Sequence, residues 1–133
     1  MIYADANVLI RLIEGDATTR APIEARLQPF RGIAGSLVTS RLSRLECRIQ
    51  PIRVGDAVRL AKFDRFFNTL EVRLLDVSPA VVEKATDLRA RLNVKTPDAI
   101  HLASAILARA AAFLTGDLGL TRTRCTEIPI EVL

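Results

Sequence analysis

The first fourteen residues, MIYADANVLIRLIE, constrain the fold of this chain more than any other segment. Ile2 and Tyr3 are typical of a buried strand, and apolar residues return with helical spacing from Val8 onward. The polar residues Asp5 and Asn7 lie where the strand gives way to the helix. In open parallel α/β sheets this is where ligands bind, because the carboxyl ends of the strands open into a crevice. Asp5 is therefore a candidate site residue. The alternative is that Asp5 or Asn7 serves only as the helix N-cap.

The rest of the chain continues the alternation of short strands and helices. Strands are predicted at residues 33–38, 72–77, 111–114 and 127–133, and helices at 16–28, 40–50, 54–70, 80–92 and 96–109. Pro51 is predicted to end the helix that begins after Ser40, and Pro129 places the last strand at a sheet edge. The predicted fold class is α/β, with a central, mostly parallel sheet of about four to five strands flanked by helices.

Length and composition bound the remaining choices. The chain has 133 residues, which fits one domain over 1–133 with a continuous core. No apolar run approaches the ~20 residues that a membrane span needs, and no charged leader marks a signal peptide. We therefore expect a soluble, cytoplasmic protein without membrane contact. Cys47 and Cys125 are far apart and belong to no metal-binding spacing, so two reduced thiols are expected.

The predicted helix at residues 40–50 has two separate stripes of side chains. One is basic and consists of Arg41, Arg44 and Arg48. The other is apolar and consists of Leu42, Leu45 and Ile49. Glu46 borders the apolar stripe and has no cation three or four positions away, so its partner is water or a group from elsewhere in the fold. A site residue and a solvated surface glutamate both fit this pattern.

The basic stripe accounts for part of an uneven charge distribution. The net charge is +4 with a pI near 9.7, and all of the excess lies in the first 75 residues. An unpaired basic stripe favours a polyanionic partner, and we predict that Arg41, Arg44 and Arg48 lie along the path of that partner. A merely solvated basic face has the same composition and stays open.

The predicted helix at residues 54–70 has a wide apolar face. This face consists of Leu60, Phe63, Phe67 and Leu70, and Phe66 widens it. Such a face usually packs into the core. Part of it, or of the helices near it, is predicted to contact a second subunit or a partner protein.

The segment KTPDAIHLASAILARA places another acid at the start of a helix. Thr96 is predicted as the N-cap, Pro97 as the first helical residue and Asp98 as a first-turn acid. The helix is apolar on nearly all sides, so it is expected to be central, and an acid at its start faces a cleft more readily than bulk solvent. The alternative role of Asp98 is to complement the helix dipole. His101 is interpreted as a packed, hydrogen-bonded side chain and is left out of the chemistry.

A fourth acid, Asp117, follows Thr115 and Gly116 at the end of the predicted strand 111–114. The triplet from Asp117 to Gly119, Asp-x-Gly, is equally typical of a turn, and taken alone it favours a turn. In a parallel sheet, however, the acids can converge at one end, and converging carboxylates repel one another unless a cation binds. Oxygen ligands without His or Cys suit Mg²⁺ or Mn²⁺, and such an ion can activate water.

Four motifs occur in order along nearly the whole chain: DANVL at Asp5, S-x5-E from Ser40 to Glu46, TPDAIHLA at Asp98 and LTGD at Asp117. Together they resemble the PIN-domain family, most closely the VapC toxins of toxin–antitoxin pairs. The residues after Asp117, LGL, depart from the family's more usual aromatic residue.

The resemblance implies a single PIN-like domain that acts as a Mg²⁺- or Mn²⁺-dependent endoribonuclease. It implies Asp5, Glu46, Asp98 and Asp117 as the catalytic and metal-binding acids, and Asn7, Ser40 and Thr115 as supporting polar groups. It also implies a homodimer inhibited by a VapB-like antitoxin whose chain enters the active-site groove.

Two other functions remain open at this point. A phosphoacceptor or phosphotransferase domain also places an Asp after its first strand, but a receiver expects a Lys after a late strand, where Gly116 and Asp117 occur. A non-catalytic RNA-binding module needs only basic charge and a groove, although it has no need for all four acids. Neither a G-x-G-x-x-G sequence nor a Walker loop is present, which argues against a nucleotide cofactor.

Overall fold

A five-stranded sheet forms the centre of the protein, and every strand pair in it is parallel. The computed structural model describes all residues, 1–133. The strands lie in the order β3-β2-β1-β4-β5, and β5 is at an edge, as Pro129 predicts. Their bounds are β1 Ile2–Ala4, β2 Leu37–Ser40, β3 Val72–Leu75, β4 Phe113–Thr115 and β5 Ile130–Val132. The predicted α/β class with a parallel sheet is confirmed.

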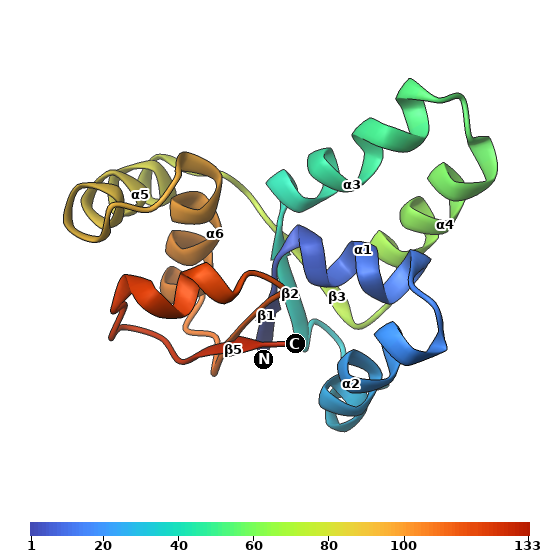
Figure 1. Cartoon of the computed structure of the whole chain (residues 1–133), viewed down its shortest axis with the longest axis horizontal. Coiled ribbons are helices and arrows are strands. Elements are labelled where there is room, and N and C mark those ends of the chain that lie inside the picture. Colours follow the sequence, from blue (N-terminus) through green and yellow to red (C-terminus); the bar gives the residue numbers. More distant parts are fainter.

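Helices cover both faces of this sheet (Figure 1). One layer contains α5 (Pro79–Leu92) and α6 (Thr96–Leu107). The other contains α1 (Ala6–Glu14), α2 (Ala17–Leu27), α3 (Arg41–Arg53) and α4 (Ala57–Phe67). Two short 3₁₀ helices, η1 (Gln28–Phe30) and η2 (Leu118–Thr123), complete the chain. No helix is both long enough and apolar enough to span a bilayer.

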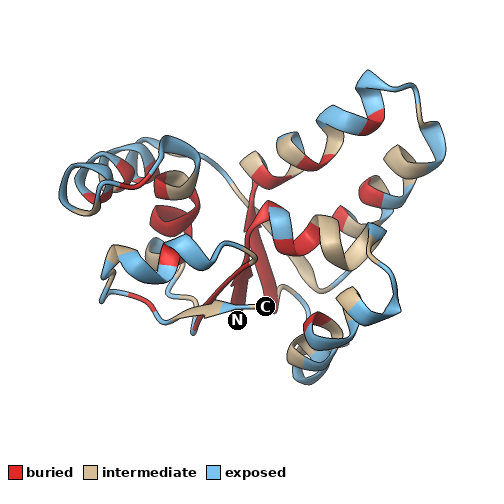
Figure 2. Ribbon diagram, viewed as in Figure 1, coloured by how far each residue is buried: buried red, intermediate tan, exposed pale blue.

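The central strands are buried on both sides because their residues alternate between two cores (Figure 2). Tyr3 of β1 packs into the core beneath α5 and α6, while Ile2 and Ala4 pack into the core on the opposite face. Such strands need apolar residues at every position, as in all-parallel sheets. The apolar start of the chain therefore becomes a central strand.

The strand order creates a crevice beside β1. The chain runs from β1 outward through β2 to β3, then returns to place β4 on the other side of β1. The segments that follow β1 and β4 consequently leave the sheet at its carboxyl end on either side of this reversal, which is where open α/β sheets bind ligands.

Two predicted boundaries at prolines are wrong. Helix α3 continues to Arg53, and Pro51 is buried in its last turn. The φ angle of a proline suits a helix, and the loss of one hydrogen bond near the helix end is tolerated when the ring packs inward. Thr96 is the first residue of α6 and not its N-cap, because the carbonyl of Lys95 already accepts the first helical hydrogen bond, from the N–H of Ala99.

Glycine turns explain two further differences. β2 begins at Leu37 and not at residue 33, because Gly32 and Gly35 take positive φ angles of 74° and 64° in the preceding turn. Helix α4 begins at Ala57 and not at residue 54, because Gly55 has a φ of 70° and Asp56 caps the helix through the N–H of Arg59.

Candidate active site

Asp5 caps a helix and also lines the crevice beside β1. It is the N-cap of α1, and its Oδ1 accepts a hydrogen bond of 3.0 Å from the N–H of Val8. Its Oδ2 accepts a second hydrogen bond, from the hydroxyl of Thr115 at the end of β4. Only 6 % of Asp5 is exposed, and burial raises the pKa of its carboxyl, while the bonds from Thr115 and Val8 oppose that rise. The N-cap bond thus fixes a carboxylate at the crevice.

The crevice contains a cavity of about 290 Å³ that gathers three of the four predicted acids. Its walls come from the end of β1 and from α1, α3 and α6, and they consist of Asp5, Ala6, Asn7, Ile10, Glu46, Asp98 and His101. Three separate segments of the chain each contribute one carboxylate. The predicted convergence is therefore observed for Asp5, Glu46 and Asp98.

Asp98 is the least compensated of these carboxylates. It lies in the first turn of α6, is half-buried, and accepts no hydrogen bond from the protein. Burial raises the pKa of its carboxyl, the negative charges of Asp117, Asp5 and Glu46 raise it further, and His101 opposes the rise. The cavity thus concentrates negative charge, and its wall contains no lysine or arginine.

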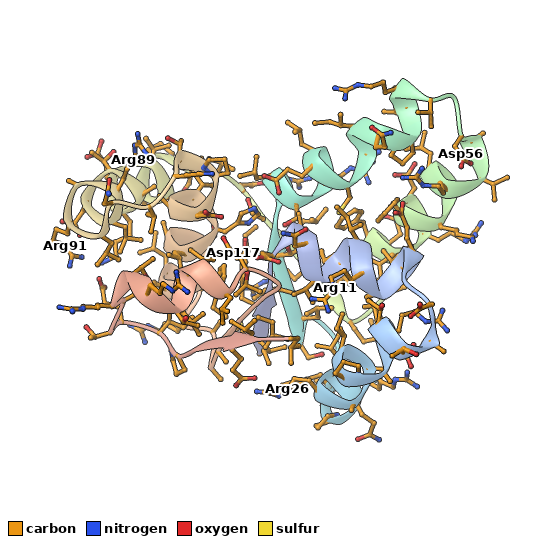
Figure 3. All side chains as sticks on the ribbon, viewed as in Figure 1. Arg11, Arg26, Asp56, Arg89, Arg91 and Asp117 are labelled. Carbon is orange, nitrogen blue, oxygen red and sulfur yellow. The ribbon has the colours of Figure 1, made fainter.

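Asp117 lies outside the cavity wall, near the middle of the molecule (Figure 3). Its Oδ1 accepts a hydrogen bond of 2.7 Å from the N–H of Gly119 and so caps η2, while its own N–H donates to the Thr115 hydroxyl. The turn interpretation of this residue is therefore correct. Its charge nevertheless acts on Asp98, so the two interpretations do not exclude each other.

The supporting polar residues have different surroundings. Asn7 lines the cavity. Thr115 donates to Asp5 and accepts from Asp117, so it joins two of the acids. Ser40 is the N-cap of α3, where its hydroxyl accepts from the N–H of Leu42, and its backbone N–H donates to the Tyr3 hydroxyl. It supports the site through the backbone and does not line the cavity.

His101 is packed and hydrogen-bonded, as interpreted from the sequence, and it also lines the cavity. Its Nε2 lies 3.2 Å from Oε2 of Glu46, and its Nδ1 lies 2.7 Å from the Tyr3 hydroxyl. The missing partner of Glu46 is therefore a side chain from α6. One signal pointed to this histidine: it lies one helical turn from Asp98, on the same face of the helix.

The basic stripe on α3 is not unpaired, which corrects the sequence-based expectation. Arg44 and Arg48 both contact Asp64 of α4, at 3.1 and 2.9 Å. Arg41 forms an exposed ion pair with Asp76. Asp64 lies on the neighbouring helix, so a search for acids within α3 could not find it.

The model of the PIN domain matches residues 2–124 of the chain. This chain belongs to the PIN domain family. No curated protein sequence matches it.

Solved structures with the same fold come from bacterial toxin–antitoxin proteins. DNA-bound VapBC from Salmonella typhimurium is 19% identical, with 99% of this chain and 98% of that chain covered and a TM-score of 0.77. VapBC2 from Rickettsia felis, bound to a promoter DNA fragment, is 16% identical over the same shares, again with a TM-score of 0.77. VapC20 from Mycobacterium tuberculosis, a sarcin–ricin loop cleaving toxin, is 18% identical with 97% and 99% covered and a TM-score of 0.71. At these identities the likeness establishes the fold.

The donor groups of this PIN domain suit a hard divalent cation. The cavity presents mainly carboxylate oxygens, together with the Asn7 side chain and the His101 ring, and no thiol. No three acidic, histidine or cysteine side chains are already arranged to enclose an ion, since Asp5 and Glu46 make hydrogen bonds within the protein. The arrangement therefore fits an ion that binds one or two carboxylates and keeps water in its shell, as Mg²⁺ commonly does.

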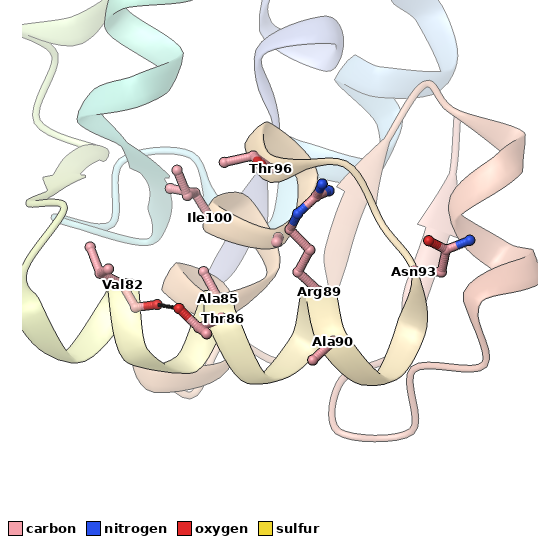
Figure 4. Close-up of a pocket in the computed structure, with 9 residues that line it drawn as sticks. Val82, Ala85, Thr86, Arg89, Ala90, Asn93, Thr96 and Ile100 are labelled. Atoms are coloured by element: carbon pink, nitrogen blue, oxygen red, sulfur yellow. Dashed lines mark hydrogen bonds between the residues drawn. The ribbon is translucent and has the colours of Figure 1, made fainter.

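A second cavity of this PIN domain, between α5 and α6, has different chemistry (Figure 4). It measures about 510 Å³ and contains no acidic residue. Its one charged side chain, Arg89, donates to the carbonyl of Val94 within the fold. The acid-lined cavity is accordingly the candidate active site, although it is the smaller of the two.

Proposed function

We propose that this protein is a VapC-like toxin that hydrolyses RNA phosphodiester bonds as a Mg²⁺- or Mn²⁺-dependent endoribonuclease. The observation that carries the proposal is the single cavity into which Asp5, Glu46 and Asp98 project from three separate elements. Within a PIN domain, carboxylates at the carboxyl ends of parallel strands are suited to binding a hard cation and not to forming a packed core.

Each acid contributes in a different way to this function. Asp5 is held in one orientation by Val8 and Thr115, so its carboxylate is preorganised. Asp98 has both oxygens free of protein donors and is the carboxylate best able to bind an ion. Asp117 adds negative potential from beside the cavity. When bound, the cation supplies charge stabilisation at the scissile phosphate and an activated water for attack on phosphorus.

The basic stripe of α3 supports an RNA substrate. Arg41, Arg44, Leu45, Arg48, Ile49, Ile52 and Arg53 surround a shallow groove of about 630 Å³ on the helix that also supplies Glu46. Three of these arginines already contact Asp64 or Asp76, so phosphate groups would compete with these acids for them. The RNA path over Arg41, Arg44 and Arg48 therefore stays a prediction.

Partners follow from the same proposal. We infer a homodimer in the cytoplasm that is inhibited by a VapB-like antitoxin, because similar folds occur in VapBC complexes. Several large apolar side chains of α3 and of the turn after it are exposed and available to a protein partner: Leu45, Ile49, Ile52 and Val54.

The phosphoacceptor alternative has less support. A phosphoacceptor needs an Asp whose oxygen can attack a phosphodonor. Asp5 is 6 % exposed, and both of its oxygens accept hydrogen bonds within the protein. Its surroundings favour a fixed, charged ligand over an attacking nucleophile.

One incubation tests the proposed function. Purified, antitoxin-free protein is mixed with total RNA in the presence of Mg²⁺, Mn²⁺ or EDTA, with Asp98→Asn as the control protein. We expect discrete RNA fragments with the metal and none with EDTA or with the variant. Equal cleavage by wild type and variant would mean a contaminating nuclease, and RNA binding without cleavage would favour a non-catalytic module.

A further inference from the structure

A buried chain of hydrogen bonds runs from the sheet to the candidate active site. The backbone N–H of Ser40 donates to the Tyr3 hydroxyl at 3.2 Å, the Tyr3 hydroxyl lies 2.7 Å from Nδ1 of His101, and Nε2 of His101 lies 3.2 Å from Oε2 of Glu46. Tyr3 is fully buried and His101 is 3 % exposed, so water does not compete for the inner bonds. The chain ends on a carboxylate that lines the acidic cavity.

The donors and acceptors determine which histidine nitrogen carries the proton. A tyrosine hydroxyl has one proton, and here the oxygen already accepts from Ser40. The Thr39 hydroxyl also lies near Tyr3, but it is bonded to the Ala4 carbonyl and the Ser43 hydroxyl. The acceptor within hydrogen-bond distance for the Tyr3 hydroxyl proton is therefore Nδ1 of His101. Nδ1 must then be unprotonated, so the proton of the neutral imidazole is on Nε2 and is donated to Glu46.

The other states of the histidine satisfy this chain less well. With the proton on Nδ1, the Tyr3 hydroxyl loses its acceptor, and the lone pair of Nε2 faces the carboxylate oxygen of Glu46. A doubly protonated ring satisfies Glu46 but again leaves the Tyr3 proton without an acceptor. A buried donor without a partner is costly, which favours the Nε2–H form.

We propose that the Tyr3–His101 pair is a positioning device that holds the Glu46 carboxylate in one orientation at the cavity. Its relevance to catalysis rests on the proposed function, whereas the hydrogen-bond chain itself does not. Glu46 is on α3, while Asp98 and His101 are one turn apart on α6. The histidine therefore fixes the distance between acids from two different helices, as outer hydrogen-bond partners do around metal ligands.

The first experiment measures the histidine tautomer in the complete, metal-free protein. His101 is the only histidine in the chain, so its ring signals need no assignment. In a ¹⁵N-labelled sample at neutral pH, we expect the Nε2–H tautomer in wild type. Tyr3→Phe keeps the ring that stacks on Phe113 and removes the hydroxyl, and we expect it to yield a tautomer mixture. The Nδ1–H form in wild type would overturn the proposal.

The second experiment asks whether the pair positions Glu46 for an ion, with Mn²⁺ alone as the probe. His101→Leu removes both ring nitrogens, and we expect Mn²⁺ affinity to fall roughly 10–100-fold, the usual loss when an outer partner of a metal ligand is removed. His101→Gln keeps an N–H donor at the same reach, and we expect it to recover most of that loss. If the Leu variant does not fold, Tyr3→Phe serves in its place, with a smaller expected loss.

The outcomes separate this proposal from the proposed function. Equal Mn²⁺ affinity of wild type and the Leu variant would overturn the positioning role even if RNA is cleaved. Equal losses in the Leu and Gln variants would also overturn it, because they would indicate that only packing matters. A wild type that has the Nε2–H tautomer but neither binds Mn²⁺ nor cleaves RNA would contradict the proposed function. The hydrogen bonds from Ser40 to Glu46 would then have only a structural role.

Discussion

Among single residues, Asp98 offers the most direct test of the candidate site. In the metal-free protein its charge lies close to those of other acids, which raise the pKa of its carboxyl in addition to the effect of burial. Asp98→Asn removes one of the repelling charges, so we expect unchanged or higher thermal stability in EDTA. Mg²⁺ or Mn²⁺ should stabilise wild type by mass action, by about 2.7 kcal/mol at one hundred times the dissociation constant, and the variant much less. RNA cleavage should fall by orders of magnitude.

A control variant measures how the loss of a helix carboxylate outside the site affects stability and the metal response. Asp87 lies on α5 and pairs with Arg91 through two hydrogen bonds. Asp87→Asn should lower stability only slightly, because the ion pair that it breaks is exposed, and leave the metal response unchanged. If Asp98→Asn behaves in the same way, Asp98 only complements the dipole of α6.

At the scale of elements, an ion-pair cluster attaches the segment before β5 to α5. Glu127 accepts from Lys84 and Arg91. These bonds, that of Lys84 first, hold the pKa of the Glu127 carboxyl below its ordinary value of 4.5. The folded state therefore binds this proton less tightly than the unfolded chain does. The stabilisation is present above pH 4.5 and is lost as the pH falls through the lower folded-state value.

This cluster predicts a pH-dependent stability difference. Glu127→Gln should cost a few tenths to about 1 kcal/mol at neutral pH, because the pairs are largely exposed, and less in acid. Urea unfolding at neutral pH and well below pH 4.5 measures the difference. Glu83→Gln is the control, because it removes one negative charge from α5 at a residue with no ion pair. Its effect on stability should not become smaller in acid. Equal pH dependence of the two variants would show that the cluster does not contribute.

The basic stripe of α3 is tested at the same scale. Replacing Arg41 and Arg48 by Gln should weaken RNA binding and lower the slope of log affinity against log salt by roughly one unit per lost phosphate contact, somewhat less for single strands. Arg91→Gln with Arg109→Gln removes equal charge from α5 and from the turn after α6 and should have little effect. Equal slopes in both double variants would mean that the stripe is only a solvated face.

At the scale of the whole molecule, the exposed apolar side chains concern assembly. The sequence predicted that part of the apolar face of α4 contacts a second subunit or a partner protein. In the structure Phe63 and Phe67 of this face are buried in the core of the domain. On the neighbouring α3, Ile49 is 42% exposed. Ile49→Glu should therefore weaken homodimer or antitoxin association and leave the fold intact.

Sedimentation measures the mass of the protein alone and of its complex. Leu107→Glu is the control, because this residue is similarly exposed at 47%, at the far end of α6 from Asp98. A monomeric wild type would contradict the dimer, and an Ile49 variant that assembles normally would exclude α3 from the interface.

Local features were predictable from the sequence because they depend on residues close together in the chain. Asp5, Ser40 and Ser78 cap helices through bonds that span two or three residues. Apolar runs and helical periodicity located the strands and helices, and errors lay at the ends of these elements, in some cases where a glycine turn or a tolerated proline shifted the boundary. Asp5, Asp98 and Asp117 could be singled out for the same reason, since each stands at a strand end or a helix start.

Only the tertiary structure decided which of these groups meet. The partner of Glu46 is His101, 55 positions away, and the partner of Asp5 is Thr115, 110 positions away. Asp64 joins Arg44 and Arg48 from a neighbouring helix. Such contacts follow from the strand order and from helix packing on the sheet, which no local pattern encodes. The residue types therefore indicated the chemistry of the site, and the order of the parallel strands assembled it.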